Sequence, residues 1–318
     1  MDSVLFVNAL EGVFALVTLG IIGYVIAALK WAGSESRILL PRIITNISLP
    51  PYLMYTIMKH FQRDRIIELL QGILPPLIAV SLAFILAACI AKFFRVQRMH
   101  LGLFCACIAN SNTIFIGIPV NIAIFGESAM PYVLLYYMAS TIFFWTIGQY
   151  SILTDSKNKN IVSYKNVRFS KIISPPLMGF IIGVIFTIIG VELPGFIENV
   201  AKNLGSMTTP LAMIFIGISI HDIGFKNISI NKDIILVIIG RMLLAPMIMF
   251  FISKLFNLQN SVAHVFIVQS SLPVMMQAAI LSAYYNADSN FGSQAVAYTT
   301  ILSIVFIPIL IAILTQAF

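Results

Sequence analysis

Charged residues are scarce in this chain. Of its 318 residues, 10% are Asp, Glu, Lys or Arg, whereas a soluble domain carries about 25%. Hydrophobic residues make up 59%, and the mean hydropathy is +0.98. This composition excludes an ordinary soluble globular protein and predicts an all-α protein that crosses the membrane several times.

Cysteine is also scarce. Cys89, Cys105 and Cys107 all fall inside apolar stretches, and their spacing fits neither a disulfide scaffold nor a Cys-x-x-Cys pair. The four histidines lie at or near the ends of apolar stretches and show no metal-ligand spacing. We therefore expect no metal and no cofactor.

Catalytic signatures are missing as well. The sequence contains no HExxH, GxSxG, GxGD or P-loop, so an enzyme is not expected. Without an ATP-binding motif, transport would be driven by a gradient of an ion or a solute. The net charge of +7 comes from basic residues in short links between apolar stretches. That distribution is typical of membrane orientation and not of a nucleic-acid surface.

Apolar stretches of about 20 residues each suit membrane-spanning helices. Ten are expected, at 5–29, 37–59, 67–91, 99–126, 130–153, 171–190, 196–220, 233–254, 262–286 and 293–316. The longest link, 154–170, is polar and rich in Lys and Asn. It separates a first unit, 1–153, from a second, 171–318, and no soluble domain is expected. Asp2 and the length of the first stretch argue against a cleavable signal peptide.

Basic residues predict the orientation of the chain. Ten spans place both termini on one side, and the odd-numbered links carry twelve Lys and Arg residues against five on the other side. The positive-inside rule then places the link 154–170 in the cytoplasm and both termini outside a plasma membrane. The cluster Lys59–Arg65 runs against this distribution.

An odd number of spans in each half makes the two halves inverted relative to each other. Prolines recur in both: Pro119 and Pro273 lie 154 residues apart, and Pro50 and Pro210 lie 160 apart. Paired interruptions of this kind indicate a binding site where two inverted repeats meet. The alternative is that proline is simply common in membrane helices.

The segment from Asn110 to Asn121 is the most informative one. It places amides, hydroxyls, Gly117 and Pro119 in the middle of an apolar stretch. Pro119 lacks an N–H and leaves the carbonyl of Phe115 without a helical partner. Because unsatisfied polar groups in hydrocarbon cost several kcal/mol, the segment predicts a helix broken beside a buried or wet cavity, as in secondary transporters.

Asn112 is the first candidate ligand, because an amide offers both donors and acceptors to a carboxylate, hydroxyl or amide solute. Alternatively, Asn112 satisfies backbone groups freed by the break. Asn110 and Thr113 would point in other directions on a helix and are candidates for that capping role. Gly117 would let another backbone approach closely.

The other half offers a matching set. In the ninth span Pro273 frees the carbonyl of Gln269, and Gln277 is expected to face the same cavity as Asn112. Half-helices that begin at these breaks would direct their N-termini inward and favour an anion. Asn46, close to Pro50 in the second span, is a further candidate.

Arg241 is the one cation well inside a predicted span. It lies eight residues beyond Asp233, or about 12 Å into the membrane. Its charge could balance an anionic solute or form part of a gate. Alternatively, it extends back to the membrane surface, as expected for Arg42. Glu11 is a candidate for proton coupling.

Several motifs together resemble the auxin efflux carrier family, which includes bacterial malate and malonate permeases. Asn112-Thr-Ile-Phe-Ile-Gly117-Ile-Pro119 is similar to that family's Asn-Thr-Gly-Phe-x-Gly-x-Pro segment. The other motifs, in order and with matching spacing, are Leu49-Pro50, Lys171-Ile-Ile-Ser-Pro175-Pro176, Pro210-Leu-Ala, Arg241-Met-Leu-Leu-Ala-Pro246, Leu272-Pro273, Tyr285-Asn-Ala-Asp288 and Thr300-Ile-Leu-Ser-Ile-Val-Phe-Ile-Pro308.

The resemblance implies ten transmembrane helices in two inverted five-helix repeats, with crossed broken helices 4 and 9. It further implies a carrier of organic anions, often a homodimer, with Asn112 near the crossing as a solute ligand. Ile114 stands where the family commonly has Gly, and Gln277 where bacterial members often have Asn. The solute and the coupling ion, proton or sodium, therefore stay open. Two alternatives are a sodium-coupled carrier of an amphipathic acid and a membrane sensor or scaffold that does not move its solute.

Overall fold

The computed structural model describes residues 2–33, 35–60, 71–156, 175–223 and 231–317. Across these residues the backbone is helical, with a single isolated antiparallel bridge in place of a sheet. Five helices in the described part of the chain are long and apolar enough to cross a membrane, and shorter apolar helices accompany them. The prediction of an all-helical, multi-pass membrane protein is therefore confirmed.

The predicted link 154–170 falls almost entirely outside the described residues, as do the first residues of the predicted third and sixth spans. The helices of the first half are α1 (Asp2–Ala28), α2 (Ser36–Ile43), α3 (Leu49–His60), α5 (Leu74–Phe93), α6 (Leu101–Ala109), α7 (Gly117–Phe125), α8 (Met130–Phe143) and α9 (Gln149–Thr154). Those of the second half are α10 (Pro175–Ile189), α11 (Gly195–Ser206), α12 (Thr208–Ile223), α13 (Lys232–Ile239), α14 (Ala245–Leu255), α15 (Asn260–Ser271), α16 (Met276–Tyr284) and α17 (Ser289–Ala317).

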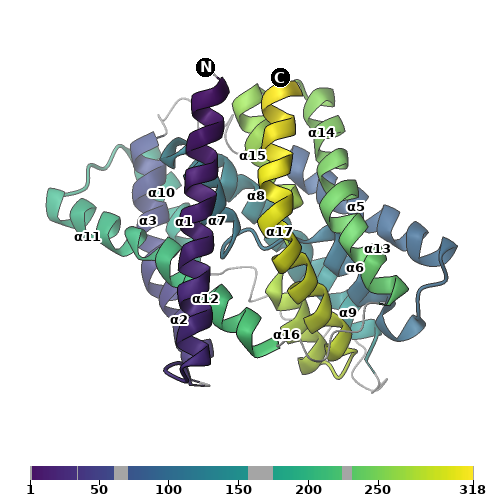
Figure 1. Ribbon diagram of the computed structural model, residues 1–318. Helices are drawn as coiled ribbons and strands as arrows, with labels where there is room; N and C mark the ends of the chain where they lie inside the picture. Colours follow the sequence, from purple (N-terminus) through teal and green to yellow (C-terminus); the bar gives the residue numbers. More distant parts are fainter. Residues whose placement is uncertain (1, 34, 61–70, 157–174, 224–230, 318) are drawn as a thin grey trace.

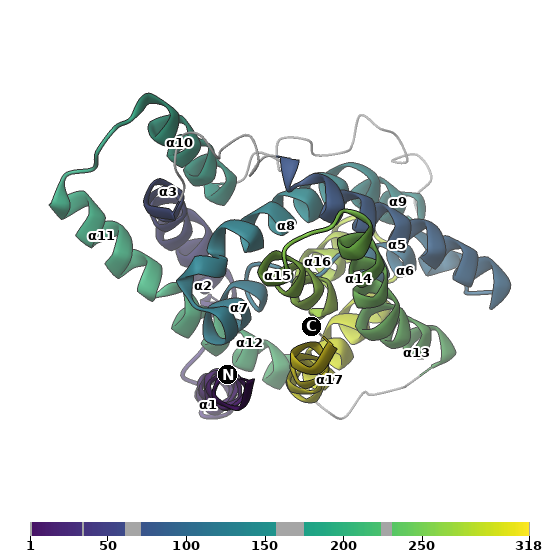
Figure 2. The same ribbon diagram turned by 90° about the horizontal axis from the view of Figure 1, so that it is seen from above.

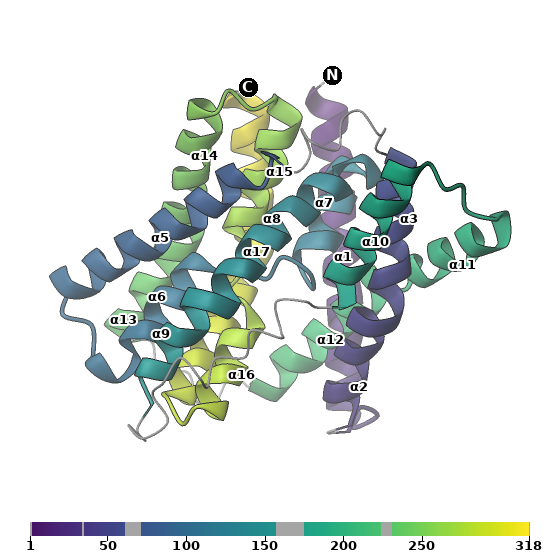
Figure 3. The ribbon, with the colours of Figure 1, turned by 180° about the vertical axis from the view of Figure 1, so that it is seen from behind.

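The helices form one bundle with the two chain termini at the same end (Figure 1). Helix α1 packs mainly on α12, and α3 packs mainly on α10. Viewed from the end that carries the termini, α10 and α11 lie on one flank and α5 and α13 on the opposite flank, with α7, α8 and α15 between them (Figure 2). From behind, α8 runs diagonally through the middle of the bundle (Figure 3).

Large apolar side chains remain exposed along the outer helices. Phe14 on α1, Ile85 on α5 and Val305 on α17 are 57–67% exposed. In water such faces would be costly, whereas lipid chains solvate them. The backbone hydrogen bonds inside each helix leave no polar group for the lipid to satisfy. Composition and fold therefore agree on a protein embedded in a bilayer.

Three helical segments widen into π-helix: η1 (Ile44–Ser48), η5 (Phe144–Gly148) and η10 (Gly240–Leu244). The first joins α2 to α3, the second α8 to α9, and the third α13 to α14. Pro50 and Pro246 each follow two residues after a widened turn, and a proline ring crowds the carbonyl four residues back. The proline at position 50 therefore widens the second span without breaking it, in contrast to the interruption that the sequence predicted there.

The predicted interruption near Pro210 is more pronounced. Helix α11 ends at Ser206 and α12 begins at Thr208, with a turn at Met207 between them. Pro210 then lies in the first turn of α12, where a missing N–H removes no helical hydrogen bond.

The backbones of α1 and α12 lie close together where Gly20 of α1 meets Gly217 of α12. A methyl group placed on Gly217 would lie 1.9 Å from the carbonyl oxygen of Gly20. Small residues let membrane helices pack at this short distance, where dispersion and weak backbone contacts replace the hydrophobic effect. Gly195, at the start of α11, has no atom within 4 Å of the same position.

We predict that Gly217→Ala destabilises the protein by about 1–3 kcal/mol, since the methyl group overlaps a backbone atom that cannot rotate away. Thermal unfolding of the purified protein in detergent measures this loss. Gly195→Ala is the matched control and should leave the unfolding midpoint close to that of the wild type. Equal midpoints for all three proteins would contradict the close packing of α1 on α12.

Candidate functional site

Two helices in the middle of the bundle are broken, and the breaks meet. One break separates α6 from α7 between Ala109 and Gly117, and the other separates α15 from α16 between Ser271 and Met276. Ser111 and Val274 form an antiparallel bridge between them. The N–H of Asn112 donates to the carbonyl of Pro273 at 2.8 Å, and the N–H of Met275 donates to the carbonyl of Asn110 at 3.1 Å. We call residues 110–116 and 272–275 the junction.

The prolines explain why each helix is interrupted here. Leu272 precedes Pro273 and adopts extended backbone, with φ −63° and ψ 158°, because a proline disfavours helical geometry in the residue before it. Pro119 lies in the first turn of α7, where no N–H is required. Both broken segments are buried, so their backbone groups must pair with protein, and the bridge lets each break supply partners to the other.

Side chains complete this pairing. The oxygen of the Asn112 amide accepts from the N–H of Phe115 at 3.2 Å. The amide nitrogen of Asn110 donates to the carbonyl of Ala106 at 3.1 Å. Helix α17 adds the hydroxyl of Thr299, which accepts from the N–H of Val274 at 3.1 Å. The bond from Asn110 to the carbonyl of Ala106 agrees with the capping role predicted for Asn110. Asn112 also caps a backbone group, the N–H of Phe115.

Gly117 lies against the other broken helix, in line with the close approach predicted for it. A methyl group at this position would stand 2.6 Å from Oε1 of Gln269 and 2.8 Å from Cδ1 of Leu272. The close neighbours are side chains of α15 and the junction, whereas the sequence predicted a backbone. Gln269 is fully buried, and neither polar atom of its side chain has a hydrogen-bond partner in the described structure.

Arg241 is fully buried at the junction. Its guanidinium donates from Nη1 to the carbonyl of Ile108 at 2.5 Å and from Nη2 to the carbonyl of Ser270. These carbonyls lie in the last turns of α6 and α15, where the helix dipole is negative and carbonyls lack helical partners. The planar guanidinium therefore ties the ends of two half-helices together with one positive charge.

Three roles were considered for Arg241: balancing an anionic solute, forming part of a gate, and extending to the membrane surface. Its contacts exclude the last of these. The side chain does not extend to the membrane surface, because it is completely enclosed. It is also not among the residues that line the cavity described next, so in this structure its charge balances helix ends. The widened turn η10 carries it.

A polar cavity of about 320 Å³ opens beside the junction. Its residues come from the two breaks and the start of α16, from α8 and η5, from η1, and from the start of α10. They are Thr45, Asn46, Asn112, Thr113, Ile114, Phe115, Tyr137, Thr141, Trp145, Pro175, Pro176, Met275 and Gln277. The volume lies at the lower end of the range for small-molecule sites, about 300–1,000 Å³.

Four of the candidate residues share this cavity: Asn46, Asn112, Thr113 and Gln277. The expectation that Gln277 faces the same cavity as Asn112 thus agrees with the geometry. Thr113 lines the cavity beside Asn112 because the segment is a turn and not a helix. The remaining candidates do not line the cavity and lie in or beside the junction: Asn110, Gly117, Pro119, Pro273 and Arg241.

Sequence reasoning missed the wall contributed by α8 and η5. Tyr137, Thr141 and Trp145 line the cavity, and their spacing of four residues places them on one helical face. That regular spacing of polar and aromatic side chains was the available signal. Thr45 was missed next to Asn46.

No charged side chain lines the cavity among the residues that the structure describes. Its electrostatics instead come from dipoles. Helix α16 begins at Met276, and the backbone N–H groups of Met276 and Gln277 have no acceptor in the described structure. Such N–H groups at a helix N-terminus favour an anion. The amide nitrogen of Asn112 likewise makes no hydrogen bond to a described residue.

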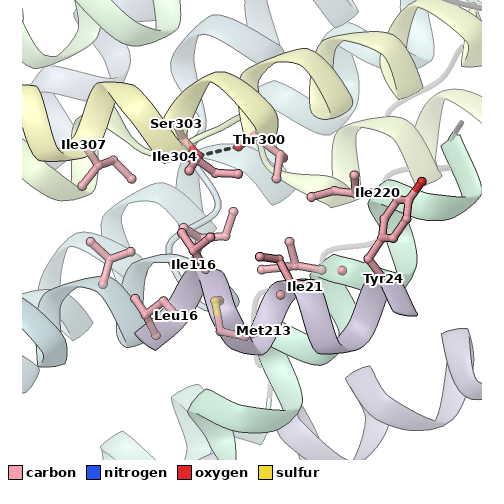
Figure 4. Close-up of a pocket in the computed structure, with 15 residues that line it drawn as sticks. Leu16, Ile21, Tyr24, Ile116, Met213, Ile220, Thr300, Ser303, Ile304 and Ile307 are labelled. Atoms are coloured by element: carbon pink, nitrogen blue, oxygen red, sulfur yellow. Dashed lines mark hydrogen bonds between the residues drawn. The ribbon is translucent and has the colours of Figure 1, made fainter. Parts of the chain in front are cut away.

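A second pocket lies between α1, α7, α12 and α17 (Figure 4). Leu16, Ile116, Met213 and Ile307 give it an apolar lining. The hydroxyls of Thr300 and Ser303 bond to carbonyls of their own helix, so this pocket offers little to a polar solute. The cavity at the junction is therefore the candidate site.

Comparison with known proteins places the chain among membrane transporters. Residues 8–311 match the model of a family described as membrane transport protein. An uncharacterized transporter of Methanocaldococcus jannaschii is 27% identical over 304 residues, covering 94% of this chain and 96% of the relative. An uncharacterized transporter of Methanothermobacter thermautotrophicus is 27% identical over 310 residues, covering 96% of this chain and 98% of the relative.

We predict that Arg241→Lys destabilises the protein, because one ammonium group cannot reproduce a fork that spans two helix ends. Loss of one buried charge-assisted hydrogen bond corresponds to about 1.5–3 kcal/mol. The midpoint of thermal unfolding in detergent reports the change. Arg42→Lys, at an exposed position on α2, is the control. A midpoint for Arg241→Lys equal to that of the control would show that the guanidinium does not hold the two half-helices.

Proposed function

The chain belongs to the membrane transport protein family, and from this premise we propose that it is a secondary transporter of a small organic anion. The resemblance to auxin efflux carriers seen in the sequence motifs agrees with this membership. The observation that carries the proposal is the neutral, dipole-lined cavity beside two bridged helix breaks. Solute binding there and alternating access around the junction would make the protein a carrier.

The polar groups of the cavity favour an anionic solute. The N-terminus of α16 opens toward it with two N–H groups that lack acceptors in the described structure. The amide groups of Asn112 and Gln277 and the hydroxyl of Thr113 stand nearby. An uncharged wall of donors binds a carboxylate without holding it through a fixed ion pair, so release on the other side stays possible.

The size of the cavity supports a small solute. A volume of about 320 Å³ suits a compact carboxylate, such as malate or malonate, better than a large amphipathic acid. The rings of Phe115, Tyr137 and Trp145 favour a second candidate, an auxin-like carboxylate with an aromatic body, which would stack on them. Competition between malate and an indole carboxylate for binding distinguishes the two.

The same proposal includes the architecture that the sequence predicted. Residues 1–153 and 171–318 would be two inverted five-span repeats joined by 154–170, with both termini outside the plasma membrane. One helix break in each half, joined by a single bridge, supports this symmetry. The coupling ion is a proton or sodium, and a homodimer is the proposed assembly.

Asn112 offers the most discriminating test, because its two amide atoms have separate roles. The oxygen caps the N–H of Phe115, whereas the nitrogen is the proposed donor to the solute. Asn112→Asp keeps an acceptor for Phe115 and replaces the donor by a negative charge. We predict that this variant stays folded and that its affinity for malate falls at least tenfold, about 1.4 kcal/mol.

Uptake of labelled malate into proteoliposomes, with an imposed proton or sodium gradient, measures the activity. Asn112→Ala should also lose uptake, and Asn203→Ala, at an exposed site on α11, should not. Wild-type affinity in a folded Asn112→Asp variant would remove Asn112 from the solute site. Equal uptake with and without the wild-type protein, for both malate and an indole carboxylate, would contradict the proposed solute class.

A further inference from the structure

Away from the cavity, His100 lies between two carboxylates. Its Nε2 is 3.0 Å from Oδ2 of Asp233, and its Nδ1 is 3.0 Å from Oδ2 of Asp288. The imidazole stacks on the ring of Phe291, with centroids 4.0 Å apart and planes within 3°. The His100 side chain is 3% exposed. Both ring nitrogens are therefore committed to acidic partners in a closed site.

Proton counting shows what this arrangement requires. A neutral imidazole has one N–H and one bare nitrogen, and an ionised carboxylate can only accept. Two hydrogen bonds from the ring to two carboxylates thus need one proton more than a neutral His100 and two ionised aspartates provide. The extra proton resides on the ring or on the facing carboxylate. Without it, a nitrogen lone pair faces an oxygen lone pair at 3.0 Å.

We propose that His100, Asp233 and Asp288 form a proton-binding site whose occupancy ties the ends of α6, α13 and α17 together. The described residues contain no group of three His, Cys, Asp or Glu side chains placed to hold a metal ion, so a proton is the ligand that this geometry takes. The site lies at the end of the bundle opposite the chain termini, where α17 begins (Figure 1).

The carboxylates are held in place independently of the imidazole. Oδ2 of Asp233 also accepts from the N–H of Gln97 at 3.3 Å. Oδ1 of Asp288 accepts from the N–H of Phe291 at 3.1 Å, as the cap of α17. Loss of the proton therefore breaks a bond to the ring while both acids keep a backbone partner. This allows the site to open without unfolding the helices that carry it.

The charged and polar groups around His100, Asp233 and Asp288 make their contacts elsewhere. Lys232, next to Asp233, donates to the carbonyl of Phe94, and Arg98 is exposed to solvent. Asp155, which follows α9, accepts from the N–H groups of Gly102 and Leu103 at 3.0 and 2.7 Å. Directly after α16, the hydroxyl of Tyr285 accepts from Gln149. None of these groups donates to Asp233 Oδ2 or Asp288 Oδ2 in the described part of the chain.

Three elements connect this site to the junction. Helix α6 runs from His100 to Asn110, a distance of about 14 Å for its nine residues. Helix α13 and the turn η10 lead from Asp233 to Arg241, and α16 leads from Met275 toward Asp288. A proton bound at one end therefore acts on the same short helices that frame the junction at the other.

The decisive variant is Asp288→Asn. An asparagine can donate to a bare ring nitrogen and still cap α17 with its oxygen, so both bonds form with a neutral His100 and no extra proton is needed. If an extra proton ties these three helix ends together, we expect the unfolding midpoint of the wild type to be lower at pH 8.5 than at pH 5.5. We expect this fall to be larger than in Asp288→Asn or His100→Gln by about 3 °C or more.

His264→Gln, on α15, is the control for histidine titration elsewhere and should keep the wild-type dependence on pH. If the unfolding midpoints of Asp288→Asn and His100→Gln both fall as much as that of the wild type between pH 5.5 and 8.5, the proposal is overturned. These unfolding measurements involve no solute, so a negative result does not bear on the proposed transport. Equally, a negative uptake experiment does not bear on the proposed proton site.

A measurement on the wild-type protein covers the case in which the variants do not fold. Nuclear magnetic resonance of protein labelled with nitrogen-15 histidine reports the hydrogens on each ring nitrogen. A buried ring at pH 5.5 should show two N–H groups hydrogen-bonded to carboxylates and lose one by pH 8.5. One neutral tautomer of His100 at both pH values would overturn the proposal.

Discussion

Two backbone hydrogen bonds hold the centre of this protein together. They join Asn112 to Pro273 and Met275 to Asn110, and they allow two helices to be interrupted deep inside the bundle. Without them, the breaks would leave buried N–H and carbonyl groups unsatisfied, at several kcal/mol each in an apolar environment. The cavity, the inward-facing helix ends and the buried arginine all depend on this pairing.

Arg241 solves a related electrostatic problem. Helices α6 and α15 both end at the junction, so their partial negative charges converge there. A fully buried guanidinium bonded to a carbonyl in each last turn offsets that charge. Met275 and Gln277, on either side of the first residue of α16, line the cavity. The junction thus separates a buried positive group, bonded to protein carbonyls, from N–H groups near the cavity that have no acceptor in the described structure.

Much of this arrangement was predictable from the sequence. Polar residues beside Pro119 and Pro273 in apolar stretches predicted the two breaks, because lipid tolerates such groups only when protein or water satisfies them. The shared location of Asn112 and Gln277 followed from the same reasoning. The carbonyl partners of Arg241 were not predicted, because the sequence cannot show that two helix ends from distant segments converge on one side chain.

Two other features were beyond sequence reasoning for physical reasons. Pro50 follows a helix that widens into a π-turn, whereas Pro119 lies in the first turn of a new helix. Whether a proline widens or interrupts a helix depends on what packs against the carbonyl four residues back. The bonds of His100 to Asp233 and Asp288 join residues 133 and 188 positions apart. No local pattern in the sequence links them.

The pairing of the two breaks is best tested by a disulfide at the bridge. Ser111 and Val274 are flanked by the two hydrogen bonds, and such a non-hydrogen-bonded pair has Cα atoms about 4.5 Å apart, within the range of a disulfide. With the exposed Cys89 replaced by Ser, Ser111→Cys combined with Val274→Cys should yield, on oxidation of the folded protein, a peptide linked through positions 111 and 274 in mass spectrometry. Two free thiols under conditions that oxidise accessible cysteines would contradict the junction.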